Sequence, residues 1–123
     1  MRTATLLQKA LHGPEVLPAK RVLRMATIDG AKALGQENEI GSLEVGKRAD
    51  LSVIRLNRIH TTPDPRDLLS SLVYAAEPSD VQTVIVDGHV LMRDRKLLTM
   101  NEAAVIQQAN VESGRLLERA GFK

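Results

Sequence analysis

Apolar positions along this chain first follow a helical period. From Thr3 to Leu11 the apolar residues recur on one helical face, and the sequence His12-Gly13-Pro14 ends the pattern. A second helical pattern starts at Pro18, which suits the first position of a helix, and it runs to Leu34. Gly35 follows as a C-terminal cap in the left-handed conformation. We therefore predict two helices within residues 1–35.

After Gly35 the pattern becomes that of β-strands. Residues 49–56 (ADLSVIRL) leave neither face polar, which predicts a strand that is covered on both sides. A short extended piece is predicted at 42–45, and residues 81–86 carry the clearest strand pattern. Asp87-Gly88 is a two-residue turn of the type that favours positive φ, and it leads to a return strand at 90–92. A polar turn at 94–96 precedes Leu97-Leu98.

Two further helices are predicted. One covers Arg66–Ala76, after a proline-bearing loop at 61–65. The other opens at Thr99, with Glu102 as its capping-box partner, and ends at Gly121. Its predicted buried stripe consists of Val105, Ile106, Ala109, Leu116 and Leu117. The chain thus offers about three strands, and open apolar edges on so small a sheet predict part of a larger fold or an oligomer.

Composition narrows the function classes. The 123 residues fit one domain, with a core of aliphatic side chains because Tyr74 and Phe122 are the only aromatic residues. A net charge of +2 is too small an excess for a phosphate-binding surface, so we expect no nucleic-acid partner. Without cysteine the sequence forms no disulfide or thiolate metal site. No apolar run approaches the roughly 18 residues of a membrane span, and the expected compartment is the cytoplasm.

Three sequence blocks occur in an order and spacing that resemble a known family. They are RMATIDGAKALG (24–35), EIGSLEVGKRADLSVI (39–54) and SDVQTVIVDGHVLMRDRKLLT (79–99). Together they resemble the C-terminal end of the metal-dependent amidohydrolase superfamily. The similarity is closest to the branch of methylthioadenosine/S-adenosylhomocysteine deaminases, guanine and cytosine deaminases and triazine chlorohydrolases.

The resemblance implies an α/β fold class, as the C-terminal fragment of a (β/α)₈ barrel with a composite β-sandwich. Residues 1–35 then correspond to the last barrel helices. Residues 36–98 correspond to the C-terminal part of the sandwich, and residues 99–123 to a closing helix. The covering layers of the 49–56 strand would belong partly to sequence outside this chain.

The resemblance also implies chemistry that these residues do not carry. Family members hold zinc or iron with an HxH pair, two single histidines and an aspartate, and the metal lowers the pKa of its water. This chain has no HxH, and it begins just after the expected position of the aspartate. No catalytic, cofactor-binding or metal-binding residue is therefore assigned to this chain, and no cofactor is expected in it.

Several residues have side chains that could bind a metal or phosphate or act in catalysis. Each also has a structural interpretation, which we favour. His12, His60 and His89 lie 48 and 29 residues apart and form no local ligand motif. Gly41, Gly46 and Lys47 match part of a phosphate-binding loop, but Arg48 replaces its Ser/Thr and a strand follows, so turn glycines are predicted. For Asp50 we predict bonds to backbone N–H groups or to Lys47 or Arg48, and for Asp87 a turn role. Basic residues on the second helix (Lys20, Arg21, Arg24 and Lys32) fit a helix-turn-helix poorly, and two packed helices with solvated charges are preferred.

The sequence therefore predicts a segment of an amidohydrolase that acts on C–N or C–Cl bonds of purine-, pyrimidine- or triazine-like rings. By itself the chain is predicted to be inactive. The alternative is a self-associating interaction or structural module without catalysis. Under both hypotheses we expect a homo-oligomer, formed through exposed sheet edges or a former barrel interface.

Overall fold

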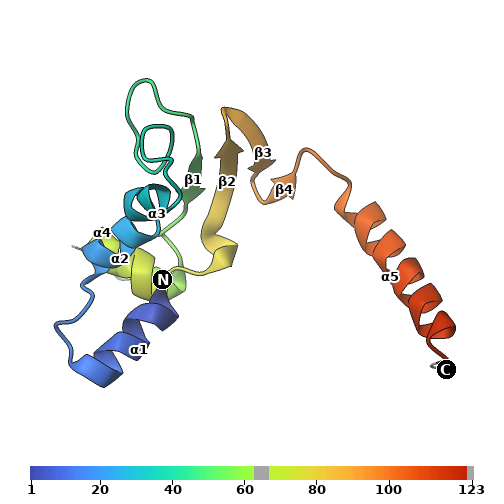
Figure 1. Ribbon diagram of the computed structural model, residues 1–123, viewed down its shortest axis with the longest axis horizontal. Coiled ribbons are helices and arrows are strands. Elements are labelled where there is room, and N and C mark those ends of the chain that lie inside the picture. Colours follow the sequence, from blue (N-terminus) through green and yellow to red (C-terminus); the bar gives the residue numbers. More distant parts are fainter. Residues whose placement is uncertain (63–66, 122–123) are drawn as a thin grey trace.

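The computed structural model describes residues 1–62 and 67–121, in which helices flank a small sheet (Figure 1). Helices α1 (Arg2–His12), α2 (Ala19–Met25) and α3 (Ile28–Ala33) precede strand β1 (Leu51–Ile54). The short turns η1 (Ile59–Thr61), α4 (Leu68–Ser70), η2 (Ser71–Ala75) and η3 (Pro78–Asp80) follow. Strands β2 (Val81–Val86), β3 (His89–Arg93) and β4 (Lys96–Leu97) lead to helix α5 (Glu102–Arg119). This order of elements confirms the predicted α/β class.

The sheet has four antiparallel strands in the order β1-β2-β3-β4, so β1 and β4 form its edges. The turn between β2 and β3 has φ of 50° at Asp87 and 76° at Gly88, as predicted for this dipeptide. The turn between β3 and β4 also has positive φ at two residues, Asp94 (47°) and Arg95 (64°), although neither is glycine. The fourth strand therefore comes from residues 96–97, and the sheet is one hairpin longer than predicted.

Asp50 links the start of β1 to the tip of the hairpin. Its Oδ1 accepts a hydrogen bond from the backbone N–H of Asp87 at 2.6 Å, and the N–H of Gly88 donates to the carbonyl of Ala49 at 3.1 Å. These two bonds confirm the structural roles predicted for Asp50 and Asp87. They also explain why β1 begins only at Leu51, because Ala49 and Asp50 bond the turn outside the ladder.

The strand predicted at 49–56 is too long, and the described residues supply only part of its predicted covering layers. β1 contains four residues, of which Ser52 and Val53 are exposed. Apolar character on both faces predicted burial, but the described residues cover neither face fully. The groove described below runs along one of these faces.

The predicted second helix is broken in two at Thr27. The backbone there leaves the helical region, with φ −129° and ψ −107°, and Thr27 Oγ1 donates to the carbonyl of Leu23 at 2.7 Å. A threonine hydroxyl that bonds back to the preceding turn competes with the helical backbone bonds. Arg21 and Arg24 bridge the break by pairing with Asp29 at 2.7 and 3.1 Å.

Two glycines shape the segment after α3. Gly35 (φ 70°) closes the helix, because Gln36 N–H donates to the carbonyl of Ala31 and Gly35 N–H to that of Lys32. This is the predicted C-terminal cap. Gly41 (φ 91°) then passes so close to α3 that an added Cβ would lie 2.8 Å from Ala31 Cβ and 2.9 Å from Ile28 Cα. The chain can return along α3 only because this residue has no side chain.

The extended piece predicted at 42–45 is not a strand. Lys47 holds this segment as a loop, since its Nζ donates to the carbonyl of Glu37 at 2.5 Å and to Ser42 Oγ at 2.6 Å. Its side chain is largely buried, and Glu44 lies 3.4 Å away. Lys47 is therefore a structural residue of the turn. This agrees with the prediction that Gly41, Gly46 and Lys47 form a turn and not a phosphate-binding loop.

The remaining helices differ in detail from their prediction. Arg66 and much of the 61–65 loop fall outside the described residues. In the described part, Asp67 caps the short helix α4, which continues as the π-helical turn η2 up to Ala75. The N-cap of α5 is Asn101 and not Thr99, since Asn101 Oδ1 accepts from the N–H of Ala104 at 3.1 Å. The capping box proposed for Thr99 and Glu102 is therefore wrong.

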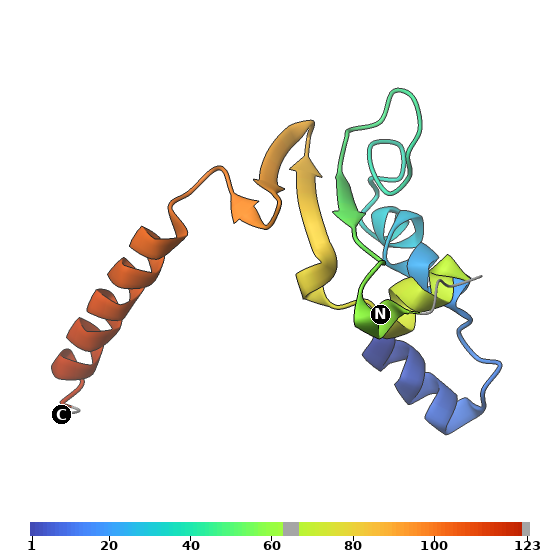
Figure 2. The same cartoon turned by 180° about the vertical axis from the view of Figure 1, so that it is seen from behind.

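Little of the chain is buried. The buried apolar residues are Ala19, Val22, Ala31 and Val73. The predicted inner face of α5 is exposed along its whole length, and the helix lies apart from the sheet (Figures 1 and 2). Among the described helices, none combines the length and the apolar character needed to cross a bilayer.

Replacing Gly41 by alanine tests the close approach to α3. We expect Gly41→Ala to lower the free energy of unfolding by about 1–3 kcal/mol more than Gly46→Ala, because both residues have positive φ but only Gly41 meets other atoms. Urea unfolding of both variants measures the difference. Equal losses would show that the contact with α3 does not form.

Candidate functional site

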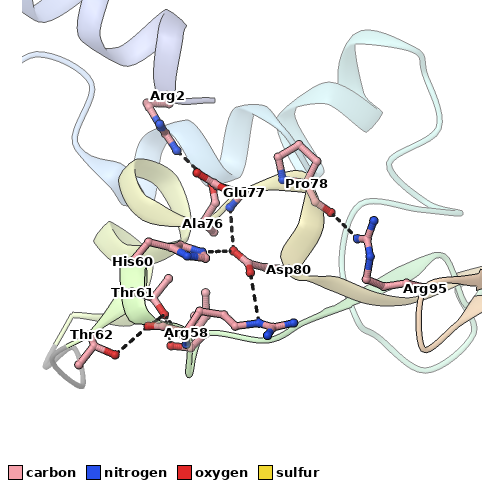
Figure 3. Close-up of polar contacts among 11 residues, drawn as sticks. Arg2, Arg58, His60, Thr61, Thr62, Ala76, Glu77, Pro78, Asp80 and Arg95 are labelled. Atoms are coloured by element: carbon pink, nitrogen blue, oxygen red, sulfur yellow. Dashed lines mark hydrogen bonds and ion pairs between the residues drawn. The ribbon is translucent and has the colours of Figure 1, made fainter.

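The one buried charged residue among the described residues is Asp80, at the start of β2. It lies within a group that we call the Asp80 cluster, consisting of Arg58, His60, Glu77 and Asp80 (Figure 3). A carboxylate is rarely buried without partners, since burial removes its hydration. The cluster is therefore the first place to look for chemistry.

Asp80 is a buried carboxylate whose charged neighbours, His60 and Arg58, remain partly exposed. His60 Nε2 donates to Asp80 Oδ2 at 2.7 Å, and the N–H of Glu77 donates to the same oxygen at 2.8 Å. The side chain of Asp80 is 1% exposed, while that of His60 is 31% exposed. Arg58 Nε lies 3.9 Å from Oδ1, which accepts no hydrogen bond from a described residue.

Two short helical turns place these side chains. In η1, Thr61 Oγ1 accepts from the N–H of Arg58 at 3.0 Å and donates to the carbonyl of Leu56. In η3, Pro78 takes the first helical position, where its missing N–H costs no hydrogen bond. Each turn thus fixes the backbone directly beside one member of the cluster.

Two further arginines, from other elements, bond the segment at 76–80. Arg2 of α1 donates to the carbonyl of Ala76 at 3.3 Å, and Arg95 of the β3–β4 turn donates to the carbonyl of Pro78 at 3.2 Å (Figure 3). The segment from Ala76 to Asp80 therefore joins α1, η1 and the sheet. Of the charged groups around this segment, His60 and Arg58 are the ones that favour an ionised Asp80.

The pKa of the Asp80 carboxyl lies below its ordinary value. The main cause is the hydrogen bond from His60, followed by the bond from the Glu77 N–H, and the positive charges of His60 and Arg58 act in the same direction. Burial opposes these effects, but it does not outweigh them. Asp80 is thus a carboxylate at neutral pH.

A histidine paired with a buried carboxylate also occurs in nucleophilic active sites, where the pair activates a hydroxyl or thiol. The hydroxyl next to His60 in sequence, that of Thr61, is committed to Arg58 and Leu56 as described above. The sequence contains no cysteine. The cluster therefore orients and joins backbone segments, and the structural interpretation of His60 is the one that its contacts support.

The structure does not bring the three histidines together. His12 ends α1 and His89 begins β3, and both are exposed at a distance from the Asp80 cluster in sequence and fold. Over residues 1–62 and 67–121, no group of three His, Asp or Glu side chains could hold a metal ion.

A second candidate is an apolar groove of about 860 Å³ between the helices and the sheet. It is open to solvent, and α2, α3, the loop at 40–43, β1 and β2 form its walls. Its apolar lining includes Leu23, Ala31, Leu34, Ile40, Ile54 and Val84. Asp50 lies at its margin, but the carboxylate already bonds the hairpin turn. The groove thus offers shape and apolar surface without convergent polar groups, which is typical of a face that packs against protein.

Sequence reasoning missed Asp80. The signal that could have found it is an acidic residue directly before the clearest strand, preceded by Pro78 and by Glu77 at the spacing of a capped turn. The partner His60 lies 20 residues away, and no local spacing connects the two.

Comparison with known proteins decides the family. The sequence model described as "Amidohydrolase family" matches residues 1–91, which is most of the chain. The chain belongs to the amidohydrolase family. This confirms the resemblance that the three sequence blocks indicated.

Amidohydrolases with deaminase names match nearly the whole chain. A 5-methylthioadenosine/S-adenosylhomocysteine deaminase of Desulforudis audaxviator is 54% identical over 119 residues, which are 96% of this chain and 27% of that protein. A 5′-deoxyadenosine deaminase of Methanosarcina acetivorans is 48% identical over 121 residues, 98% of this chain and 27% of that protein. The chain thus spans about a quarter of the length of the curated relatives that it matches.

Solved amidohydrolase structures share the fold. An adenosine deaminase from Xanthomonas campestris with bound zinc matches with a TM-score of 0.86 and 40% identity, over 93% of this chain and 26% of that one. An atrazine chlorohydrolase from Arthrobacter aurescens, complexed with zinc, matches with a TM-score of 0.79 and 26% identity, over 89% of this chain and 24% of that one. The described residues therefore fold as a segment of this barrel family. The zinc of these relatives does not fit the described residues here, because they gather no set of ligands.

Removing the charge of Asp80 tests the cluster. We expect Asp80→Asn to lower the urea midpoint of unfolding at neutral pH, since an amide loses the attraction to His60 and Arg58 and brings a buried N–H₂ group. Asp67→Asn is the matched control, because it makes the same chemical change at an exposed N-cap where asparagine caps equally well. Equal midpoints for the two variants would contradict the role of the cluster.

The lowered pKa of Asp80 predicts a pH dependence. Because the folded pKa lies below the ordinary value of 3.8, the carboxylate stabilises the fold above that value and the contribution is lost as the pH falls through the folded pKa. As the pH is lowered from about 5, the stability difference between the unmodified chain and Asp80→Asn should shrink once the pH falls below 3.8. Urea unfolding at stepped pH measures it, and a difference that grows on acidification would refute the assignment.

Proposed function

We propose that this chain is the scaffold segment of a deaminase that acts on adenosine-like substrates. The observation that carries the proposal is the 54% identity to a methylthioadenosine/S-adenosylhomocysteine deaminase over 96% of the chain. An identity this high over the whole segment supports a parent enzyme of similar specificity. The identity of 26% to the chlorohydrolase favours that reaction less.

In this proposal the described residues support the fold of the enzyme and take no direct part in metal binding or catalysis. The Asp80 cluster joins η1 and η3, Arg2 joins α1 to Ala76, and Lys47 and Gly41 hold the loop that lines the groove. The groove then receives apolar side chains from the remaining three quarters of the protein, which carries the metal and binds the purine. The exposed apolar residues that line the groove, Leu34, Leu43 and Val86, support such a cover, since a soluble chain seldom leaves a continuous apolar surface open.

A two-part assay tests the function. The purified chain, with zinc or ferrous iron, is offered 5′-methylthioadenosine, S-adenosylhomocysteine, 5′-deoxyadenosine and atrazine, and ammonia or chloride release is measured. We expect no turnover above a metal-only control. The chain is then co-expressed with the Desulforudis audaxviator relative from which the matching 119 residues have been deleted, and we expect deamination only in this combination.

The control replaces our chain by the relative's own 119-residue segment, supplied as a separate chain. If that pair is active and ours is not, the chain does not serve as the scaffold of an adenosine-type deaminase. Turnover by the chain alone would also contradict the proposal, because it would require catalytic residues within this chain.

A further inference from the structure

The turn between β2 and β3 contains a dipeptide, Asp87-Gly88, that can react with itself. The backbone nitrogen of the residue after an aspartate can attack the side-chain carboxyl carbon and close a cyclic succinimide. As the new C–N bond forms, the carboxyl group loses its OH, which leaves with the amide hydrogen as water. Glycine in the second position favours this reaction, because it has no side chain to hinder the approach. The sequence contains Asp-Gly at 29–30 and at 87–88.

Opening of the succinimide returns the water and can change the backbone. Attack of water on the side-chain carbonyl restores aspartate. Attack on the main-chain carbonyl instead leaves an isoaspartate, in which the backbone runs through the former side chain and is one atom longer. The reaction therefore consumes no oxidant, reductant or other co-reactant. A two-residue hairpin turn depends on a defined backbone geometry, so the longer backbone does not fit it.

The side chains around the turn do little to prevent this reaction. The side chain of Asp87 is 63% exposed, and a Cβ added at Gly88 would meet nothing within 4 Å. Arg48 Nε lies 3.9 Å from Asp87 Oδ1, which is too far for a hydrogen bond. Neither steric cover nor a close ion pair therefore restrains the carboxyl group.

Two hydrogen bonds to the segment before β1 restrain the backbone of the turn instead. Gly88 N–H donates to the carbonyl of Ala49 at 3.1 Å, and Asp87 N–H donates to Asp50 Oδ1 at 2.6 Å. The nitrogen of Gly88 must give up its hydrogen and turn toward the Asp87 carboxyl group before it can attack, so the bond to Ala49 has to break. The bond to Asp50 holds the other peptide group of the turn and opposes that rotation.

We infer that Asp87-Gly88 is a site of aspartate isomerisation, and that Asp50 controls the rate by holding the turn against cyclisation. Once isoaspartate has formed, the longer backbone cannot return both N–H groups to Asp50 and Ala49. The start of β1 then loses its link to the hairpin, at the margin of the apolar groove. The inference is independent of the proposed function, because it concerns only chemistry within this chain.

The second Asp-Gly pair provides an internal reference. Asp29 lies in α3, its side chain is 20% exposed, and its carboxylate pairs with Arg21 at 2.7 Å and Arg24 at 3.1 Å. These contacts are separate from the hairpin and from Asp50. Loosening of the turn alone therefore leaves Asp29 restrained, whereas unfolding of the chain releases both pairs.

Peptide mapping measures both sites in one sample. The chain is incubated at neutral pH and cut with trypsin, which places the two pairs in the separate peptides 25–32 and 67–93. Electron-transfer mass spectrometry then quantifies isoaspartate in each peptide over time. We expect Asp50→Ala to speed isomerisation at Asp87 by about three- to tenfold, the effect of one hydrogen bond on local opening, and to leave Asp29 unchanged. Asp50→Asn keeps a side-chain oxygen that accepts the bond, and it should restore the rate of the unmodified chain to within about twofold.

Two further samples set the limits of the measurement. The unmodified chain in urea gives the rate without structure, and we expect the folded chain to isomerise more slowly at Asp87. Asp87→Glu lengthens the side chain and disfavours ring closure, so it should remove the isoaspartate signal from peptide 67–93. An unchanged rate at Asp87 in Asp50→Ala would overturn the inference, as would equal increases at Asp29 and Asp87. A folded chain that isomerises at Asp87 as fast as the chain in urea would overturn it without recourse to any variant.

Discussion

The buried carboxylate of Asp80 is the interaction on which the rest of this fold depends. Apolar burial is scarce, since only four apolar side chains are buried among the described residues. Such a core contributes little of the free energy that ordering the chain costs. Asp80 compensates by joining segments that lie far apart in sequence, because His60, Arg58 and the Glu77 backbone meet at one carboxylate. Asp80 directly precedes β2, so these contacts also hold the start of that strand.

Polar links of this kind recur along the chain. Asp50 connects the first residues of β1 to the hairpin tip, Lys47 gathers the loop after α3, and Arg21 and Arg24 span the break at Thr27. Each link fixes backbone direction without requiring a covering layer. This explains how a segment of a barrel protein retains a definite arrangement while its apolar groove stays open. Polar contacts among the described residues fix the backbone, while the apolar groove remains uncovered by them.

Sequence patterns predicted the structure correctly where the conformation depends on residues that are neighbours in the chain. The Asp87-Gly88 turn, the cap at Gly35 and the limits of β2 follow from local backbone preferences, and all three were predicted correctly. Prediction failed where the backbone departs from the pattern without a glycine or proline to mark the place, and where distant contacts decide. No glycine or proline adjoins Thr27 to predict a helix break there. The β3–β4 turn likewise has positive φ at Asp94 and Arg95, although neither residue is glycine. The pairing of His60 with Asp80 spans 20 residues, so it could be seen only in three dimensions. The stripe on α5 is apolar as predicted, but its predicted burial is wrong for the described residues, because helical periodicity alone does not supply a covering element.

The central claim is that polar contacts within the chain fix its backbone while the apolar groove stays uncovered. Amide hydrogen exchange tests it most directly, measured on the chain alone and on the chain mixed with the remainder of the Desulforudis audaxviator deaminase. The account predicts that amides at the start of β2, beside Asp80, are protected in both samples. It predicts that amides of β1 and of the 40–43 loop gain protection only in the mixture, where the groove is covered. Equal exchange at β1 and at the 40–43 loop with and without the remainder would contradict the account, as would a β2 start that exchanges freely until the remainder is added.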